Sequence, residues 1–201
     1  MSDDRFGHDA YFVDQLIRPI ANLYRISTLG PDGASPGDPV AFVRQKKLAI
    51  KEDIRFFADE GEQEELFRIK ARQIFEVGGR YDVTTPAGER IGILEKVFGI
   101  SLIRSTWRIL DSTEQQIGLA QEKSVPVAVL RRLIDFVPYG ELVPIVFQFT
   151  IHVDGREIGE LRRPIGLRDR YTLTLRGDPD RRLDRRVAIA LAVALDALQS
   201  R

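Results

Sequence analysis

A run of nine apolar residues near the C-terminus, from Val187 to Leu195, constrains the fold more than any other feature of the sequence. Alanine occupies every second position of the run from residue 188 to residue 194, which favours a helix. A helix that is apolar on all sides must be enclosed by protein or by lipid. Since a membrane-spanning helix needs about 20 residues, we expect the rest of the chain to enclose this one.

The residues that precede this helix are rich in strand patterns. Between residues 22 and 176, apolar and polar side chains alternate in about twelve segments, as expected for strands with one buried face. The clearest segment has six apolar residues at alternate positions: Val143, Ile145, Phe147, Phe149, Ile151 and Val153. One further helix is expected over residues 126–135, and residues 30–39 are mostly turn formers that predict a loop.

The size of a closed sheet tests whether these strands can surround the helix. Twelve strands spaced ~4.8 Å apart and tilted by ~40° give a barrel with a radius of ~12 Å. A helix radius of ~5–6 Å plus half of the ~10 Å packing distance requires ~10–11 Å. We therefore predict a mainly β protein, a closed antiparallel barrel of about twelve strands around the C-terminal helix.

Three segments share a weak internal repeat, in which an aromatic strand, a turn and a second strand opening on Ile-Gly follow one another. The aromatic residues are Tyr81, Trp107 and Phe149, and the dipeptides that follow are Ile91-Gly92, Ile117-Gly118 and Ile158-Gly159. The repeat predicts hairpins whose second strand needs a glycine where another group crosses it or where the wall bends.

The two ends of the chain lead to further expectations. Residues 1–14 are polar and mixed in character and predict a loose leader, so residues 15–201 are expected to form a single barrel domain. Asp178 and Pro179 have the residue types of a helix cap and first helical residue, so the C-terminal helix is predicted to start here. The arginines that come next are expected in solvent at the barrel mouth: Arg181, Arg182, Arg185 and Arg186.

Composition excludes several classes of function. Thirty Lys and Arg residues balance thirty Asp and Glu residues, so no bulk attraction to nucleic acid is expected. The chain has no cysteine and two histidines, His8 and His152, too few for thiol chemistry or a histidine-rich metal site. There is no phosphate-binding glycine loop, nucleophile elbow or secretory signal. We expect a cytoplasmic protein that is not an enzyme, with no metal and no cofactor.

Two basic clusters are candidate sites for an anionic headgroup, since arginine forks and lysine charges bind phosphate. They consist of Arg44, Lys46 and Lys47 in the first cluster and Arg162, Arg163, Arg168 and Arg170 in the second. The alternative is an ordinary solvated surface, which a net charge of zero favours.

Other polar or aromatic features have simpler structural interpretations. The acidic run at residues 59–65 does not match a calcium loop and predicts a solvated hairpin tip. His152 is expected to be exposed on the polar face of its strand, and Trp107 to lie in the core.

The chain resembles the LURP-one-related proteins, which share their fold with the tubby C-terminal domain and the phospholipid scramblases. The likeness covers about residues 22–198. It rests on Phe42-Val43-Arg44-Gln45-Lys46-Lys47, Gly79-Arg80-Tyr81-Asp82-Val83, Gly88-Glu89-Arg90-Ile91-Gly92-Ile93-Leu94-Glu95-Lys96, Ser101-Leu102, Thr106-Trp107-Arg108-Ile109 and the terminal apolar helix.

The resemblance implies a twelve-stranded barrel around its helix, and a binding or regulatory role in place of catalysis. The ligand would be an anionic phospholipid headgroup or a protein partner, with at most peripheral membrane contact. A structural or protein-interaction barrel without a small ligand is the alternative. Scramblase-like lipid transfer is a weaker alternative, since the chain lacks the cysteine cluster and the proline-rich leader of scramblases. A hydrolase that uses carboxylates alone would need two acidic side chains facing each other in a cleft.

Overall fold

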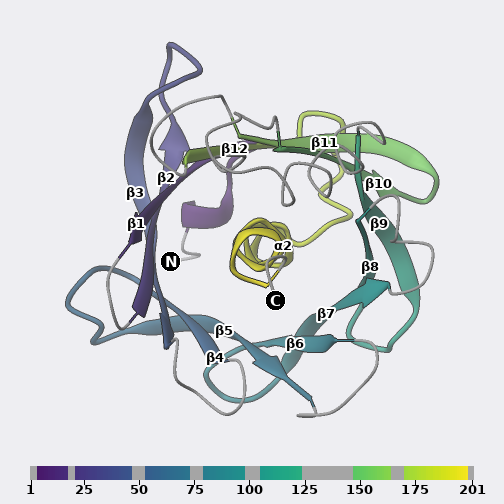
Figure 1. Ribbon diagram of the computed structural model, residues 1–201, viewed down its shortest axis with the longest axis horizontal. Coiled ribbons are helices and arrows are strands. Elements are labelled where there is room, and N and C mark those ends of the chain that lie inside the picture. The colour runs from purple at the N-terminus through teal and green to yellow at the C-terminus, as the bar shows by residue number, and fades with distance from the viewer. Residues whose placement is uncertain are drawn as a thin grey trace, which may run out of the picture.

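Twelve antiparallel strands close into a barrel around the C-terminal helix in the computed structural model, which describes residues 4–17, 21–46, 53–72, 79–97, 105–123, 147–163 and 170–198 (Figure 1). The strands are β1 (Ala10–Ile17), β2 (Ala21–Leu29), β3 (Pro36–Lys46), β4 (Asp53–Phe57), β5 (Glu65–Ala71), β6 (Arg80–Thr84), β7 (Arg90–Val97), β8 (Thr106–Leu110), β9 (Gln116–Glu122), β10 (Phe147–Val153), β11 (Arg156–Arg163) and β12 (Arg170–Thr174). The helices are η1 (Asp4–Phe6), a 3-10 turn, and α2 (Arg185–Ala197). The predicted fold class is confirmed; the helix expected over residues 126–135 lies outside the described residues.

The strands follow one another around the barrel in chain order, and β1 closes it by pairing with β12. Tyr11 lies opposite Leu173 on β12 and opposite Thr28 on β2, so β1 joins the first strands to the last. Each described strand therefore has a neighbour on both sides, and closure of this kind removes the open edges that promote aggregation.

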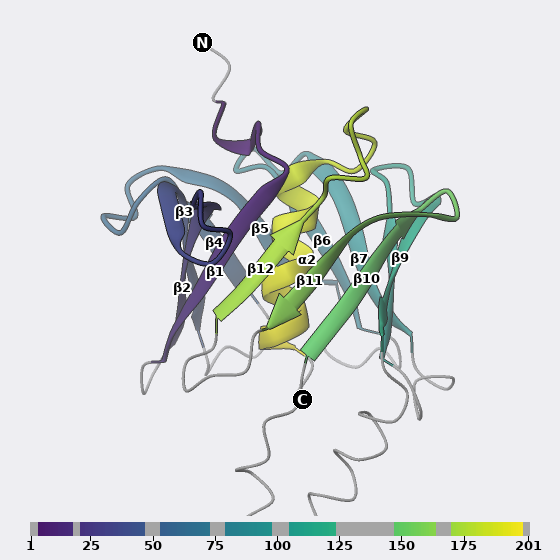
Figure 2. The same ribbon diagram turned by 90° about the horizontal axis from the view of Figure 1, so that it is seen from above.

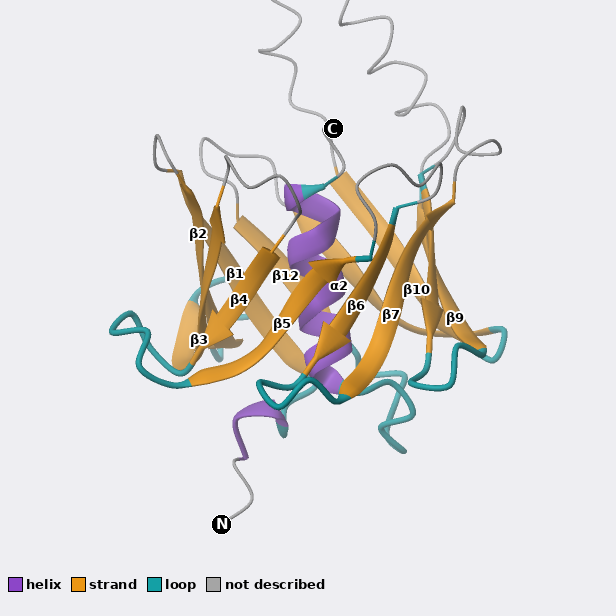
Figure 3. Cartoon of the chain, turned by 90° about the horizontal axis from the view of Figure 1, so that it is seen from below, coloured by secondary structure: helices purple, strands orange, loops and turns teal. Residues whose placement is uncertain are grey.

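Helix α2 fills the barrel and supplies the centre of the core (Figure 2 and Figure 3). Every side chain from Val187 to Leu195 is at most 2 % exposed. Large inward-facing side chains of the wall surround the helix, among them Tyr24, Phe56, Phe67, Trp107 and Phe149. The burial of Trp107 is as predicted, and the alanines let the helix approach the wall closely.

The three hairpins of the internal repeat have the same register. In each hairpin, the residue two positions after the aromatic one lies opposite the repeat glycine, and the ladder shifts next to this pair. A Cβ atom on Gly118 or Gly159 would collide with a backbone carbonyl of the following strand, and one on Gly92 with Val187 of α2. The glycines are therefore required where the next strand or the helix approaches most closely. The pairs are Val83–Gly92, Ile109–Gly118 and Ile151–Gly159.

Two segments that the sequence predicts as irregular are strands. Strand β1 begins at Ala10, within the expected leader 1–14, because Tyr11 and Val13 point into the core and are fully buried. Strand β3 begins at Pro36, so the loop that precedes it covers residues 30–35 and is shorter than predicted. His152 on β10 is half-buried and not exposed.

The helix begins later than predicted, and one of the expected surface arginines is buried. Asp184 caps α2 by accepting a hydrogen bond from the Arg186 backbone N–H at 2.8 Å. Arg181 has a left-handed φ of 51°, which is incompatible with a helix running from Asp178. Arg181 and Arg182 are exposed as expected, but Arg185 is only 3 % exposed because it folds back onto Asp178.

Candidate functional site

The first basic cluster lies at the end of β3, and its member Arg44 already forms an ion pair. Arg44 is on the outer face of the barrel, with its Nη2 atom 2.5 Å from Glu62 Oε1 in the β4–β5 turn. Lys46 is the last residue of β3, but its side chain and all of Lys47 lie outside the described residues. The acidic run is a hairpin tip as predicted, and it partly neutralises this cluster.

The second basic cluster is divided between β11 and β12. Arg162 is exposed, whereas Arg163 is half-buried with its guanidinium 5.8 Å from the ring centre of Tyr171. Arg170 forms an ion pair with Asp14 at 3.3 Å, and Arg168 lies outside the described residues. Strands β3 and β11 both end at the barrel mouth where α2 ends. They are four strand spacings apart around the barrel, which at ~4.8 Å per spacing is a separation of about 19 Å. The described residues of the two clusters therefore do not converge.

Polar side chains inside the barrel anchor the C-terminal end of α2. Asp196 accepts hydrogen bonds from the hydroxyl groups of Tyr24, at 2.8 Å, and Tyr171. Burial and the Asp196 carboxylate both raise the pKa of Tyr24, so its hydroxyl remains protonated. Lys96 donates to the Leu198 carbonyl oxygen at 3.2 Å. These contacts hold the helix end in place.

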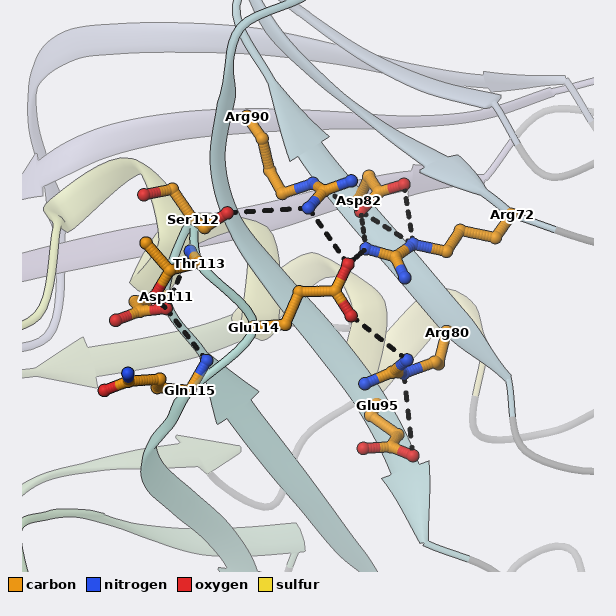
Figure 4. Close-up of polar contacts among 10 residues, drawn as sticks. All are labelled: Arg72, Arg80, Asp82, Arg90, Glu95, Asp111, Ser112, Thr113, Glu114 and Gln115. Atoms are coloured by element: carbon orange, nitrogen blue, oxygen red, sulfur yellow. Dashed lines mark hydrogen bonds and ion pairs between the residues drawn. The ribbon is translucent and has the colours of Figure 1, made fainter.

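Three arginines from neighbouring strands meet at one carboxylate on the outer face of the barrel (Figure 4). Arg72 follows β5, Arg80 begins β6 and Arg90 begins β7. Their guanidinium nitrogens lie 2.9, 3.5 and 3.1 Å from the carboxylate oxygens of Glu114, in that order. We call these three residues the arginine cluster; guanidinium groups gathered in this way are the arrangement that binds phosphate in proteins.

Two other carboxylates hold the arginine cluster in shape. Asp82 accepts hydrogen bonds from both Nε and Nη2 of Arg72, at 2.9–3.0 Å, and lies 3.2 Å from Arg90 Nε. Glu95 lies 3.7 Å from Arg80 Nε. The side chains of the cluster are 21 to 36 % exposed, so solvent and solutes reach them. The guanidinium groups are thus fixed before any ligand arrives, which lowers the entropic cost of binding.

Glu114 reaches the arginine cluster from the turn between β8 and β9. The Asp111 carboxylate shapes this turn by accepting hydrogen bonds from the backbone N–H groups of Thr113 and Gln115, at 2.8 and 3.0 Å. Glu114 itself has a left-handed φ of 71°, which non-glycine residues seldom adopt. The turn therefore presents a carboxylate to the arginines at some cost in backbone strain.

Further charges of both signs surround the arginine cluster. Lys70 on β5 is exposed and lies opposite Asp82 on β6 and Asp53 on β4, and Arg108 on β8 is 3.7 Å from Glu95. The three arginines and the carboxylates of Asp82, Glu95 and Glu114 balance one another, so the network gains a charge of +1 when Glu114 leaves.

Sequence reasoning missed this cluster because its members are far apart in the chain. Arg80, Asp82 and Arg90 occur in motifs that carry the family resemblance, and Arg80 and Asp82 share the polar face of β6. The two-residue spacing of Arg80 and Asp82, which puts both on one face of a strand, is the signal by which the sequence could have indicated this cluster. The register of β5, β6 and β7 and the reach of the Glu114 turn were needed to bring the charges together.

The titration of Glu114 should report its contact with the arginines. The hydrogen bond from Arg72, aided by the charges of Arg90 and Arg80, lowers the pKa of Glu114 below its ordinary value of 4.5. The contact is therefore complete above pH 4.5 and is lost as the pH falls through the lowered pKa. Carboxyl-carbon NMR should give a midpoint below 4.5, and Arg72→Ala should move it upward. An unchanged midpoint in that variant would contradict the contact.

Two further observations concern the part of the chain that the structure describes. No group of three or more His, Asp or Glu side chains there is placed to hold a metal ion. Within the same ranges, no helix has both the length and the apolar character needed to cross a bilayer.

Comparison with known proteins identifies one family. The model of the LURP-one-related family matches residues 40–196, which is most of the chain. The match includes the arginine cluster, Glu114 and helix α2 up to Asp196. No curated protein matches the chain.

Proposed function

Because the chain belongs to the LURP-one-related family, we propose that it is a non-catalytic binding module that recognises an anionic phospholipid headgroup through its arginine cluster. The observation that carries this proposal is the convergence of Arg72, Arg80 and Arg90 on the single carboxylate of Glu114. The clusters around Arg44 and Arg162 would then have an auxiliary role in attraction to the membrane.

A phosphate group suits this site better than the carboxylate that occupies it. A phosphomonoester carries a charge of about −1.5 to −2 and three acceptor oxygens, against one charge and two oxygens for Glu114. Asp82 and Glu95 keep the arginines extended after Glu114 leaves. The ligand therefore gains a stronger charge interaction without reorganising the wall.

The same geometry argues against acid–base catalysis at this place. The pKa of Glu114 is lowered, so its carboxyl group is ionised at neutral pH, which makes it no proton donor and only a weak base. The pKa of Arg72 is raised by its hydrogen bonds to Asp82 and Glu114, so it stays charged and is no base. These groups can bind and orient an anion.

Vesicle sedimentation tests the proposal. The wild-type protein should sediment with phosphatidylcholine vesicles that contain phosphatidylinositol bisphosphate, and much less with phosphatidylcholine alone. Arg72→Gln with Arg90→Gln should weaken binding about 30-fold, since each surface cation contributes about 1 kcal/mol near an anionic membrane. Glu114→Gln should strengthen binding, because it removes the competing charge.

Arg156→Gln is the matched control, since Arg156 is an exposed arginine on β11, five strands from β6. It should bind like the wild type. Equal binding of the double arginine variant and the control would refute the site. Binding to neither type of vesicle would favour the alternative of a protein-interaction barrel without a small ligand.

A further inference from the structure

A half-open groove lies on the outer face of the barrel, away from the arginine cluster. Its volume is about 460 Å³, within the range of pockets that bind ligands in proteins. It lies between the upper part of β3 and the β4–β5 turn, because β3 pairs with β4 only over residues 42–45 but extends to Pro36. Figure 1 shows the β2–β3 and β4–β5 hairpins projecting from the wall on this side.

The floor of the groove is apolar and already packed, whereas its lip is charged. The floor is made by Ile26, Pro39, Ala41, Phe42 and Ala58. Ile26 and Phe42 are at most 5 % exposed, so the floor is part of the fold. Arg25, Asp59 and Glu60 form the lip, and an ion pair of 2.6 Å joins Arg25 to Glu60.

One carboxylate of the lip forms no ion pair among the described residues. Asp59 accepts a hydrogen bond from the Gly61 backbone N–H at 2.7 Å, and no arginine or lysine among the described residues pairs with it. Glu60 is neutralised by Arg25, so the three charged residues of the lip sum to −1. A further cation, Arg5, donates to the Ala58 carbonyl oxygen beside the groove at 3.4 Å. The exposed Glu64 on the same turn adds to the negative potential near the groove.

We propose that this groove docks an extended peptide segment of a partner protein that carries a basic side chain next to a bulky apolar one. The apolar side chain enters the groove over Ala41 and Phe42, and the basic side chain pairs with Asp59. A purely apolar ligand would leave Asp59 unused, and an anionic ligand would be repelled by the acidic turn. The docking surface lies on β2, β3 and the β4–β5 turn, and it shares no residue with the arginine cluster.

Fluorescence anisotropy with labelled hexapeptides tests this proposal on the full chain. A peptide of alternating arginine and phenylalanine should bind. Replacing phenylalanine by glycine should weaken binding at least about tenfold, because one buried aromatic ring contributes about 1.5–3 kcal/mol. Replacing arginine by glutamate should abolish it.

Two substitutions with opposite expected effects locate the binding. Asp59→Asn should weaken the arginine–phenylalanine peptide about fivefold, as expected for an exposed ion pair. Arg25→Gln should strengthen it about threefold, since it frees Glu60. Glu64→Gln is the matched control, because it removes one charge from the same turn outside the groove lining, and it should change affinity by less than either substitution.

Equal effects of Asp59→Asn and Glu64→Gln would overturn the proposal, since the peptide would then sense only the general charge of the turn. Unchanged or weaker binding by Arg25→Gln would also overturn it. Neither substitution should alter sedimentation with vesicles, so a failure of the headgroup proposal leaves this test intact.

Discussion

Replacing Asp178 by alanine should lower the free energy of unfolding by about 3 kcal/mol, the lower end of the cost of breaking a buried ion pair, because Asp9 still pairs with Arg185 at 2.7 Å. The Asp178 Oδ2 atom lies 2.6 Å from Arg185 Nη1, and the two side chains are 2 and 3 % exposed. Burial acts to raise the pKa of Asp178, but hydrogen bonds from Arg185 and from the Leu183 and Arg182 backbone outweigh it and keep the pKa low. The carboxylate is therefore charged, and it is the buried one of the two carboxylates that pair with the Arg185 guanidinium.

Urea unfolding of paired variants separates this cost from a general loss of packing. Asp178→Leu combined with Arg185→Met should recover most of the stability, because apolar residues of similar volume can replace a buried pair. Arg186→Ala is the control, since Arg186 forms its ion pair with Asp184 at about one-third exposure. It should cost less than about 1 kcal/mol. A similar cost for Asp178→Ala and Arg186→Ala would show that the buried pair contributes no more than a surface one.

The fold could be predicted because its strongest determinant is local. The number of segments with alternating apolar residues indicates the number of strands. The all-apolar C-terminal helix requires that these strands form a barrel wide enough to enclose it. The repeat glycines Gly92, Gly118 and Gly159 also give a local signal, since each marks a close approach that a side chain would block. These features depend on residue type and period alone, which a sequence displays directly.

The charged sites could be predicted only in part, because which charges become neighbours depends on how the strands are aligned with one another. Arg44 and Arg170 are recognisable as basic residues, but their carboxylate partners, Glu62 and Asp14, come from other strands or turns. Arg185 belongs to a run of arginines typical of a surface, and only the turn at Arg181 directs it inward onto Asp178. Opposite charges that are distant in the chain become neighbours through strand pairing, which the hydrophobic pattern does not specify.

The barrel wall also determines how the core responds to a cavity. Leu191 is at the middle of α2 and is fully buried. Substitutions of leucine by alanine in protein cores cost about 2–5 kcal/mol, and the cost rises with the volume that remains empty. Since twelve strands hydrogen-bonded in a closed ring resist collapse onto the helix, Leu191→Ala should lie in the upper part of that range.

Leu191→Ala should also create a dry apolar space that accepts a small apolar molecule, as engineered cavities of this kind bind benzene or xenon. Benzene should therefore raise the melting temperature of Leu191→Ala but not that of the wild type. Leu16→Ala, at a half-buried position on β1, is the matched control and should show a smaller loss and no response to benzene. A loss below about 1 kcal/mol, without a benzene effect, would mean that the wall relaxes onto the helix and that closure does not make the core rigid.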